Sequence, residues 1–214
     1  MGQKSKIMVQ YNNLKITMVC LAIVFNSCGQ NDEGVMINGV KWATCNVDVP
    51  GTFAANPEDA GMFYQWNRKT AWNAKDSTVI NWDDTNAEGD IWEKANDPSP
   101  TGWRLPSNDD IEKLLDTIKV SNEWIILNGV NGIKFTDKAT GKSIFLPVIG
   151  FRSIYGGTLR EVGLYSYYWS STPHDSDNDR ANRLVLCINY VNLAQNTYRK
   201  QGFSIRCVAD RAIQ

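Results

Sequence analysis

Short apolar runs separated by polar turn residues predict a chain made largely of strands after residue 34. Residues 35–47 predict a hairpin of two short strands that turns at Asn38-Gly39, because this dipeptide accepts the positive φ angles of a two-residue turn. Lys138-Ala139-Thr140-Gly141 predicts a second turn. Further strands are predicted at 130–136, 143–149, 167–170, 183–190 and 202–208.

Two segments predict short helices. Ser107 is a good N-cap residue, acids follow it in the first turn, and the apolar residues after it recur with helical spacing. Those apolar residues are Ile111, Leu114, Leu115 and Ile118. A second helix is predicted from Pro57 to about Trp66, with Asn56 as its cap. Strands, two helices and then many strands predict an α+β domain rather than alternating βαβ units.

Aromatic residues mark two candidate binding regions. The long irregular segment 67–101 carries Trp72, Trp82 and Trp92 among polar residues, and such a loop is either functional or held down by its own side chains. In a strand, Tyr165, Tyr167 and Trp169 share one face, which suits stacking on sugar rings or on a protein partner. The alternative for both regions is packing against the body of the domain.

Charge and composition narrow the function. The chain has 214 residues, with 22 Lys plus Arg against 23 Asp plus Glu, so no basic excess exists to neutralise a nucleic-acid backbone. A single histidine, His174, disfavours a His-rich metal site or a His-based triad and is interpreted as a surface residue. No Gly-rich phosphate loop, Gly-x-Ser-x-Gly elbow or Cys-x-x-Cys pair is present, so the sequence favours a protein that does not catalyse.

The first 27 residues are typical of an export signal. Residues 1–15 contain lysines and no acid, and 16–25 are apolar except for Thr17. Ten helical residues span about 15 Å, too short to cross a bilayer. Ser27-Cys28 then resembles the lipobox of bacterial lipoproteins, which predicts lipid attachment at Cys28; the alternative is an ordinary signal peptide. The expected organisation is a signal at 1–27, a tether at 28–34 and one domain at 35–214.

Cysteine positions suggest one disulfide outside the cytoplasm. Cys20 leaves with the signal, and Cys187 lies in a continuous apolar run that predicts a buried thiol. Cys45 and Cys207 both end strand-like segments near the two termini of the domain, so a Cys45–Cys207 bridge is favoured over three free thiols.

The segment 175–179 has the alternating acids of a calcium loop but is not an EF-hand. Arg180 stands where that motif needs glycine, and Leu186 where it needs glutamate. The weak calcium ligands considered are Asp175, Asp177 and Asp179, and calcium is the one cofactor considered. The alternative is a solvated loop tip.

Five stretches together resemble the Fibrobacter succinogenes major paralogous domain, a family of bacterial extracytoplasmic proteins that are commonly lipoproteins. The resemblance covers about 35–210, and the stretches are Lys41 to Val47, Asp97 to Pro106, Phe145 to Arg152, Tyr168 to Thr172 and Gly202 to Val208.

The resemblance implies a C-type lectin-like fold, with two short helices, small antiparallel sheets, long irregular loops, and the first and last strands side by side. Many members have Cys where this chain has Ser99, so a disulfide from that loop cannot form here, which strengthens Cys45 as the partner of Cys207. The implied function is a non-catalytic, lipid-anchored module at the outer membrane or cell surface that binds a glycan or a protein. Its expected binding face uses Trp72, Trp82, Tyr165, Tyr167 and Trp169.

The alternative function is an enzyme related to the formylglycine-generating, sulfatase-modifying factors. The helix start at Trp103-Arg104-Leu105-Pro106-Ser107 resembles that branch, whose members use a late pair of cysteines. Here the late cysteines are Cys187 and Cys207, far apart in the sequence, which makes the enzyme the weaker hypothesis.

Overall fold

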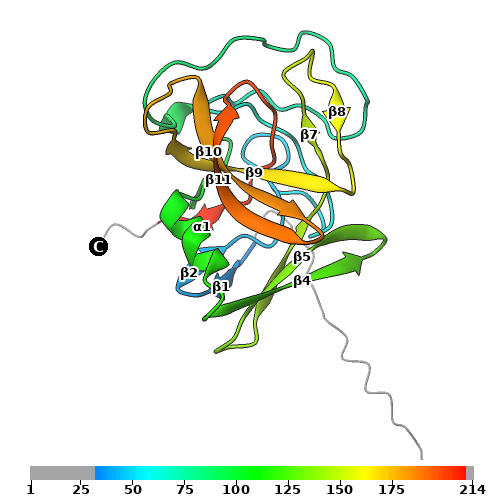
Figure 1. Cartoon of the computed structure of the whole chain (residues 1–214), viewed down its shortest axis with the longest axis vertical. Helices are drawn as coiled ribbons and strands as arrows, with labels where there is room; N and C mark the ends of the chain where they lie inside the picture. Colours follow the sequence, from blue (N-terminus) through cyan, green and yellow to red (C-terminus); the bar gives the residue numbers. More distant parts are fainter. Residues whose placement is uncertain (1–31, 211–214) are drawn as a thin grey trace, which may run out of the picture.

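The elements of the domain are mostly strands, arranged in small antiparallel sheets around one α-helix (Figure 1). The computed structural model describes residues 32–210. The elements are β1 Val35–Ile37, β2 Val40–Trp42, a 3-10 turn Lys94–Asn96, β3 Trp103–Arg104, α1 Asn108–Leu115, β4 Val120–Leu127, β5 Val130–Asp137, β6 Ser143–Pro147, β7 Phe151–Arg152, β8 Leu159–Arg160, β9 Tyr165–Pro173, β10 Arg180–Cys187, β11 Tyr190–Tyr198 and β12 Val208–Ala209. Within 32–210, no helix is long and apolar enough to cross a membrane.

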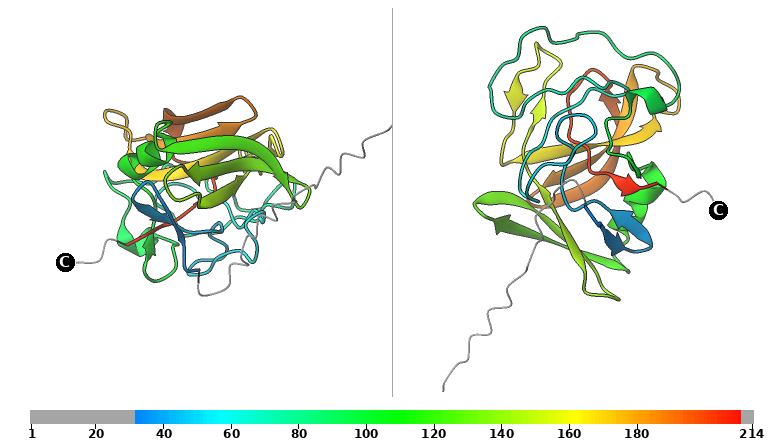
Figure 2. Two further views of the ribbon diagram at one scale, coloured as in Figure 1. Left: turned by 90° about the horizontal axis from the view of Figure 1, so that it is seen from below. Right: turned by 180° about the vertical axis from the view of Figure 1, so that it is seen from behind.

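The strands form four sheets, with orders β1-β2-β12-β3, β11-β10-β9, β4-β5-β6 and β7-β8. The β4-β5-β6 sheet lies at one end of the molecule, and the long segment 67–101 crosses the other end (Figure 2). The predicted strands at 130–136, 143–149, 167–170 and 183–190 all correspond to observed strands with shifted bounds. The predicted strand at 202–208 is instead a series of isolated bridges that ends in β12. The long strands β4 and β11 were not predicted.

The first and last strands lie side by side, as the family resemblance led us to expect. The hairpin of β1 and β2 turns at Asn38 and Gly39, whose φ angles are 44° and 77°. Val208 of β12 then pairs antiparallel with Trp42 of β2, and the Ala43 amide donates to the Cys207 carbonyl at 2.9 Å. Backbone hydrogen bonds thereby join the N-terminal strands of the domain to its C-terminal strand, beside α1 (Figures 1 and 2).

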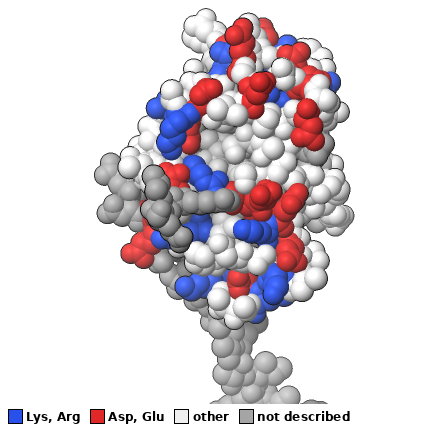
Figure 3. All heavy atoms as spheres, turned by 90° about the vertical axis from the view of Figure 1, so that its left-hand side faces the viewer, with Lys and Arg blue, Asp and Glu red and all other residues white. Residues whose placement is uncertain are grey.

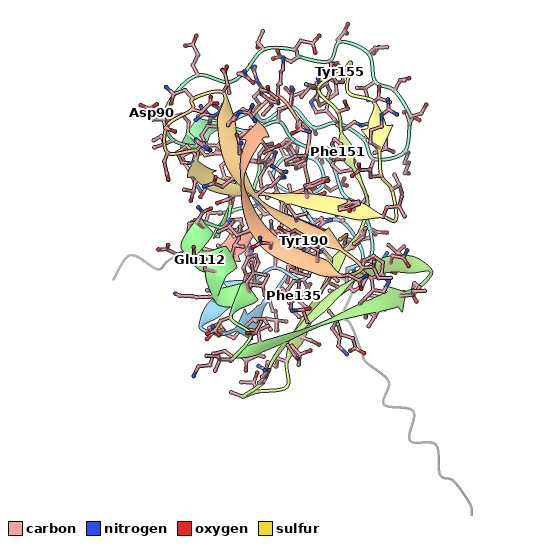
Figure 4. The ribbon with its side chains drawn as sticks, in the orientation of Figure 1. Asp90, Glu112, Phe135, Phe151, Tyr155 and Tyr190 are labelled. Carbon is pink, nitrogen blue, oxygen red and sulfur yellow. The ribbon has the colours of Figure 1, made fainter. Side chains whose placement is uncertain are left out.

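The β11-β10-β9 sheet separates two hydrophobic cores. Tyr168, Leu184 and Leu186 point into one core, which contains Phe135 and the apolar residues of α1. Trp169 and Ala181 belong to the second core, which is built on Trp66, Phe203 and Ile205. Figure 4 shows Phe135 and Phe151 on opposite sides of this sheet. Both faces of the sheet are thus buried near its centre, so any free surface lies toward the end that carries Tyr165 and Tyr190.

The predicted helix after Pro106 is confirmed, but it is shorter than expected. The Ser107 hydroxyl accepts a hydrogen bond from the Asp110 amide, and the Asp110 carboxylate accepts one from the Ser107 amide, which completes a capping box. The helix ends at Leu115, so Ile118 falls outside it and is 79 % exposed. Among the described residues α1 is the one α-helix, which makes the domain mostly β.

The second predicted helix, Pro57 to Trp66, is wrong. The Asn56 amide donates to the Asp59 carboxylate, which favours a local turn over a helix start. Downstream, Phe63 exchanges both backbone hydrogen bonds with Trp72, and Tyr64 does the same with Phe203. Pairing with distant segments therefore overrides the local helix signal at this position.

The predicted Cys45–Cys207 disulfide is also wrong. Cys207 is a buried free thiol whose Sγ donates to Ser99 Oγ at 3.1 Å, and burial raises the pKa of that thiol. Cys187 is a buried free thiol, as expected. The pairing of the chain ends was correctly anticipated, but the Cys207 side chain turns toward the 97–101 segment. The lipid-attachment residue Cys28 and the signal at 1–27 lie outside the described residues.

Candidate functional site

The predicted row of aromatic residues on β9 exists, and the strands beside it extend it. Tyr165 and Tyr167 stack with ring centroids 6.3 Å apart and an angle of 9°. Cys187 of β10 lies opposite Tyr165 on one side and opposite Tyr190 of β11 on the other, so both tyrosines project from the same face. Tyr165 is 39 % exposed and Tyr190 is 48 % exposed. Two exposed rings therefore flank β10.

A cation and two polar groups complete this surface. Val185 lies opposite Tyr167 on β9 and Asn192 on β11. The Asn192 amide donates to the Tyr190 hydroxyl at 2.8 Å, and the Arg183 guanidinium carbon lies 5.2 Å from the centroid of Tyr167. We call the outward surface formed by Tyr165, Tyr167, Arg183, Tyr190 and Asn192 the tyrosine face. Figure 4 shows the position of Tyr190 on this sheet.

Tyr167 links the tyrosine face to the core beneath it. Its ring stacks on Phe203 at 5.0 Å and meets the edge of Phe151 at 5.1 Å. Its hydroxyl donates to the Glu161 carboxylate at 3.1 Å, and burial, together with that carboxylate, raises the pKa of the phenol. The phenol thus stays protonated and fixed in place.

Trp169 shares the strand face of Tyr165 and Tyr167, but it is fully buried. Its ring packs 4.3 Å from Phe203, and its Nε1 donates to the Tyr64 carbonyl at 2.6 Å. Of the three aromatic residues predicted on this strand, Tyr165 and Tyr167 are accessible for contact, whereas Trp169 belongs to the core, as the alternative interpretation held.

Trp72 and Trp82 hold the long loop against the domain. Their ring centroids are 4.9 Å apart, and Trp72 is fixed further by its backbone pairing with Phe63. A Cβ added to Gly157 would lie 2.4 Å from Trp82, and one added to Gly202 would lie 3.0 Å from it. The indole of Trp82 is thus wedged against two glycine backbones. The structure therefore favours anchoring over ligand contact for both tryptophans.

The long loop nevertheless surrounds an open hollow of about 940 Å³. Its walls are polar, and several of its lining groups already have partners in the protein. Asn67 Oδ1 accepts from the Glu93 amide and the Asn96 side chain, and Arg68 pairs with Asp83, outside the lining, at 2.6 Å. The lining residues are Asn67, Arg68, Lys69, Thr70, Thr85, Asn86, Ala87, Glu88, Glu93 and Asn96. This hollow lies within the irregular segment 67–101, one of the two predicted binding regions, but none of its lining residues is aromatic.

The acidic segment 175–179 does not gather its carboxylates. Asp177 Oδ2 pairs with Arg180 at 3.0 Å, and its Oδ1 accepts from the Asp179 amide. The His174 ring accepts from the Ser176 amide at 3.2 Å. Within the described residues, no group of three or more His, Cys, Asp or Glu side chains is placed to hold a metal ion. Asp175, Asp177 and Asp179 therefore do not form a preassembled calcium site. On the side shown in Figure 3, acidic and basic groups are interspersed.

The Trp103-Arg104-Leu105-Pro106 stretch has a structural explanation. Arg104 Nη1 donates to Asp110 at 2.7 Å and to the Leu105 carbonyl at 2.9 Å, and Trp103 is buried in the second core. Burial alone would raise the pKa of Asp110, but hydrogen bonds from Arg104 and Ser107 outweigh it and hold that pKa below its usual value. The ion pair of Arg104 with Asp110 thus orders the start of α1.

Sequence reasoning missed Tyr190, Arg183 and Asn192. Strand β11 was not recognised, because Asn192, Gln195 and Asn196 interrupt its apolar residues. The signal that could have found it is Asn189, a turn residue between two runs that contain aromatic and β-branched residues. With β11 paired to β10, the register places Tyr190 on the same face as Tyr165.

Comparison with known proteins gives a family. The chain matches the Fibrobacter succinogenes major domain over residues 33–209, nearly the whole described region. It therefore belongs to that family. No curated protein and no solved structure matches it.

Proposed function

We propose that this protein is a non-catalytic, extracytoplasmic binding module whose tyrosine face receives a glycan. The observation that carries the proposal is the pair of exposed rings, Tyr165 and Tyr190, held on either side of β10 by strand register. Aromatic rings offer an apolar surface to a sugar, and the neighbouring Asn192 and Glu161 supply polar groups for its hydroxyls. A lectin-like architecture is supported by the paired first and last strands and the long loop fixed over the sheets.

The proposed binding is modest in affinity. A shallow sheet surface leaves much of a ligand in water, and the cost of ordering the two partners offsets much of the contact energy. Its rigidity is an advantage, because Tyr167 is fixed by Phe151, Phe203 and Glu161 and in turn supports Tyr165. Little side-chain entropy is then lost on binding.

A glycan array probed with the purified full-length chain tests this function. We expect binding to a subset of glycans, lost in Tyr190→Ala and retained in Tyr155→Ala, which removes a tyrosine that is 77 % exposed outside the tyrosine face. Binding that depends on Tyr155 rather than Tyr190 would place the site elsewhere. Turnover of a sulfatase-type cysteine peptide would contradict the non-catalytic proposal.

We also propose that Cys28 carries the lipid that anchors the protein outside the cytoplasm. This part of the account rests on the sequence of 1–28 alone. Cys28→Ala should release the protein into the soluble fraction or leave it unprocessed. Unchanged membrane fractionation and processing would contradict this.

A further inference from the structure

Arg183, which is partly buried, differs from the fully buried arginines of this domain. Arg152, Arg199 and Arg206 are fully buried, and each donates hydrogen bonds to backbone carbonyls or an asparagine side chain. Arg183 Nε and Nη1 are buried as well, yet neither has an acceptor among the described residues. Its side chain is therefore not explained by the carbonyl contacts that hold the other three.

The described surroundings of Arg183 supply no balancing charge. Its guanidinium lies 5.2 Å from the Tyr167 ring and 5.9 Å from the Phe203 ring. The phenols of Tyr167 and Tyr190 are the groups that act on it electrostatically, and the neighbouring carboxylate of Glu161 is engaged with the Tyr167 hydroxyl. Burial lowers the pKa of the guanidinium, as expected for a partly desolvated cation.

A partly desolvated cation without an acceptor favours an anion at its accessible edge. The Arg183 side chain as a whole is only partly buried, so part of it reaches the surface beside the Tyr167 ring. An oxyanion that reaches this edge forms a charge-assisted hydrogen bond, and the apolar rings around it reduce screening by water.

We infer that the tyrosine face selects acidic sugars, with Arg183 binding the carboxylate of a uronic acid whose ring stacks on Tyr165 or Tyr190. This inference rests on the proposed function, since it names the ligand class of the same surface. Tyr165 and Tyr190 are separated by two strand spacings, about 10 Å, with Cys187 directly between them, and Arg183 lies four residues further along β10, where its guanidinium approaches the Tyr167 ring. An oligosaccharide that stacks on Tyr165 or Tyr190 and extends along β10 toward Tyr167 thus meets a ring and then the Arg183 cation.

The flat arrangement favours a sugar over an acidic peptide. Peptides that bind a sheet commonly add a strand at its edge and place alternate side chains in pockets. The tyrosine face is instead the exposed end of one face of the sheet, where Tyr165 and Tyr190 are exposed and Asn192 Nδ2 donates to the Tyr190 hydroxyl.

The test compares acidic oligosaccharides with their carboxyl-reduced counterparts, which keep the same rings without the charge. Oligogalacturonate and oligomannuronate are titrated into the full-length chain at low salt by calorimetry, beside oligoglutamate. We expect at least one acid form to bind about tenfold or more tightly than its reduced form. Arg183→Gln should abolish this preference, whereas Arg160→Gln, the same charge change at an exposed arginine of β8, should keep it.

A structural role for Arg183 predicts a different result. Since Arg183 Nε and Nη1 donate to no described residue, Arg183→Met should leave the midpoint of thermal unfolding within about 4 °C of the parent. A much larger fall would show that the side chain serves the fold and would overturn the inference.

The remaining outcomes separate the inference from the proposed function. Two outcomes would overturn the acidic preference but not the proposed binding function. One is equal affinity for the acid and reduced forms, and the other is binding to neutral array glycans without binding to either acid. Failure to bind any glycan, neutral or acidic, would overturn both. Stronger binding of oligoglutamate than of either oligouronate would assign the face to an acidic protein and overturn the inference.

Discussion

Arg199 lies with its guanidinium carbon 4.1 Å from the centroid of the Trp66 ring, and its Nη1 donates to the Gly89 carbonyl at 2.7 Å. A fully buried cation thus joins the second core to the long loop. Arg152 performs a comparable role at the other end of that loop, because its Nη2 donates to the Asn73 carbonyl at 2.6 Å. These contacts explain how an irregular segment can hold one conformation.

Arg199→Met should lower the free energy of unfolding by about 3 kcal/mol, because it removes the donors to the Gly89 and Arg180 carbonyls. Hydrogen exchange should increase in 83–93. The matched control, Arg160→Met, changes an exposed arginine and should cost less than about 0.5 kcal/mol. Denaturant unfolding checks both values, and equal losses would contradict the anchoring role.

Adjacent glycines test the anchoring of Trp82. Gly156 and Gly157 have φ angles of 62° and 63°, but a Cβ meets nothing at Gly156 and lies 2.4 Å from Trp82 at Gly157. Gly156→Ala should lower the free energy of unfolding by about 1 kcal/mol through backbone strain alone. Gly157→Ala should lower it by about 2 kcal/mol more, because the Trp82 indole must move to make room for the new Cβ. If the two variants unfold at the same denaturant concentration, Trp82 is not wedged there.

Ser99→Cys should form a disulfide with Cys207, whose Sγ lies 3.1 Å from Ser99 Oγ. The closed loop is long, so the bridge should stabilise the domain by up to about 4 kcal/mol. Peptide mapping without reductant identifies the link, and Ser99→Ala, which cannot form it, is the control. If the thiol introduced at position 99 stays reduced under oxidising conditions, the two side chains do not face each other.

Asp110→Asn should destabilise the domain by about 2 kcal/mol at neutral pH, because Asp110 binds Arg104 and completes the helix cap. The folded-state pKa of Asp110 is lowered, so its carboxylate contributes stability above the unfolded-state pKa of about 3.9. That contribution is lost as the pH falls through the folded-state value. The difference in the free energy of unfolding between Asp110→Asn and the parent should therefore disappear at acid pH.

Asp109→Asn is the matched control, since Asp109 is an exposed acid in the same first turn. It should cost less than Asp110→Asn at neutral pH. If the loss of unfolding free energy caused by Asp110→Asn stays constant down to strongly acid pH, the role assigned to the Asp110 carboxylate is contradicted.

Sequence patterns correctly predicted those elements that are stabilised by residues close to one another in the chain. The Asn38-Gly39 turn and the Ser107 cap were readable because each is fixed by residues within a few positions along the chain. The helix at 57–66 failed because Phe63 and Tyr64 pair with Trp72 and Phe203, and the latter lies far away in the sequence. Strand pairings of that kind leave little trace in local periodicity.

The candidate site was predicted in part for the same reason. Tyr165 and Tyr167 were found because alternation along one strand places them together, whereas Tyr190 and Arg183 join them only through the register of β10. The burial of Trp169 against Phe203 depends on a segment that arrives late in the chain. The Cys207 pairing was misjudged because paired backbones do not fix which way a side chain turns.

The central claim is that ligand binds the tyrosine face rather than the hollow of the long loop. The most direct measurement is the dissociation constant of the best array glycan for the parent chain and two double variants. The account predicts that Tyr165→Ala with Tyr190→Ala weakens binding about tenfold or more. Lys69→Ala with Thr70→Ala, in the lining of the hollow, should change it less than about twofold. Loss of binding in the hollow variant, with binding kept in the tyrosine variant, would contradict the account.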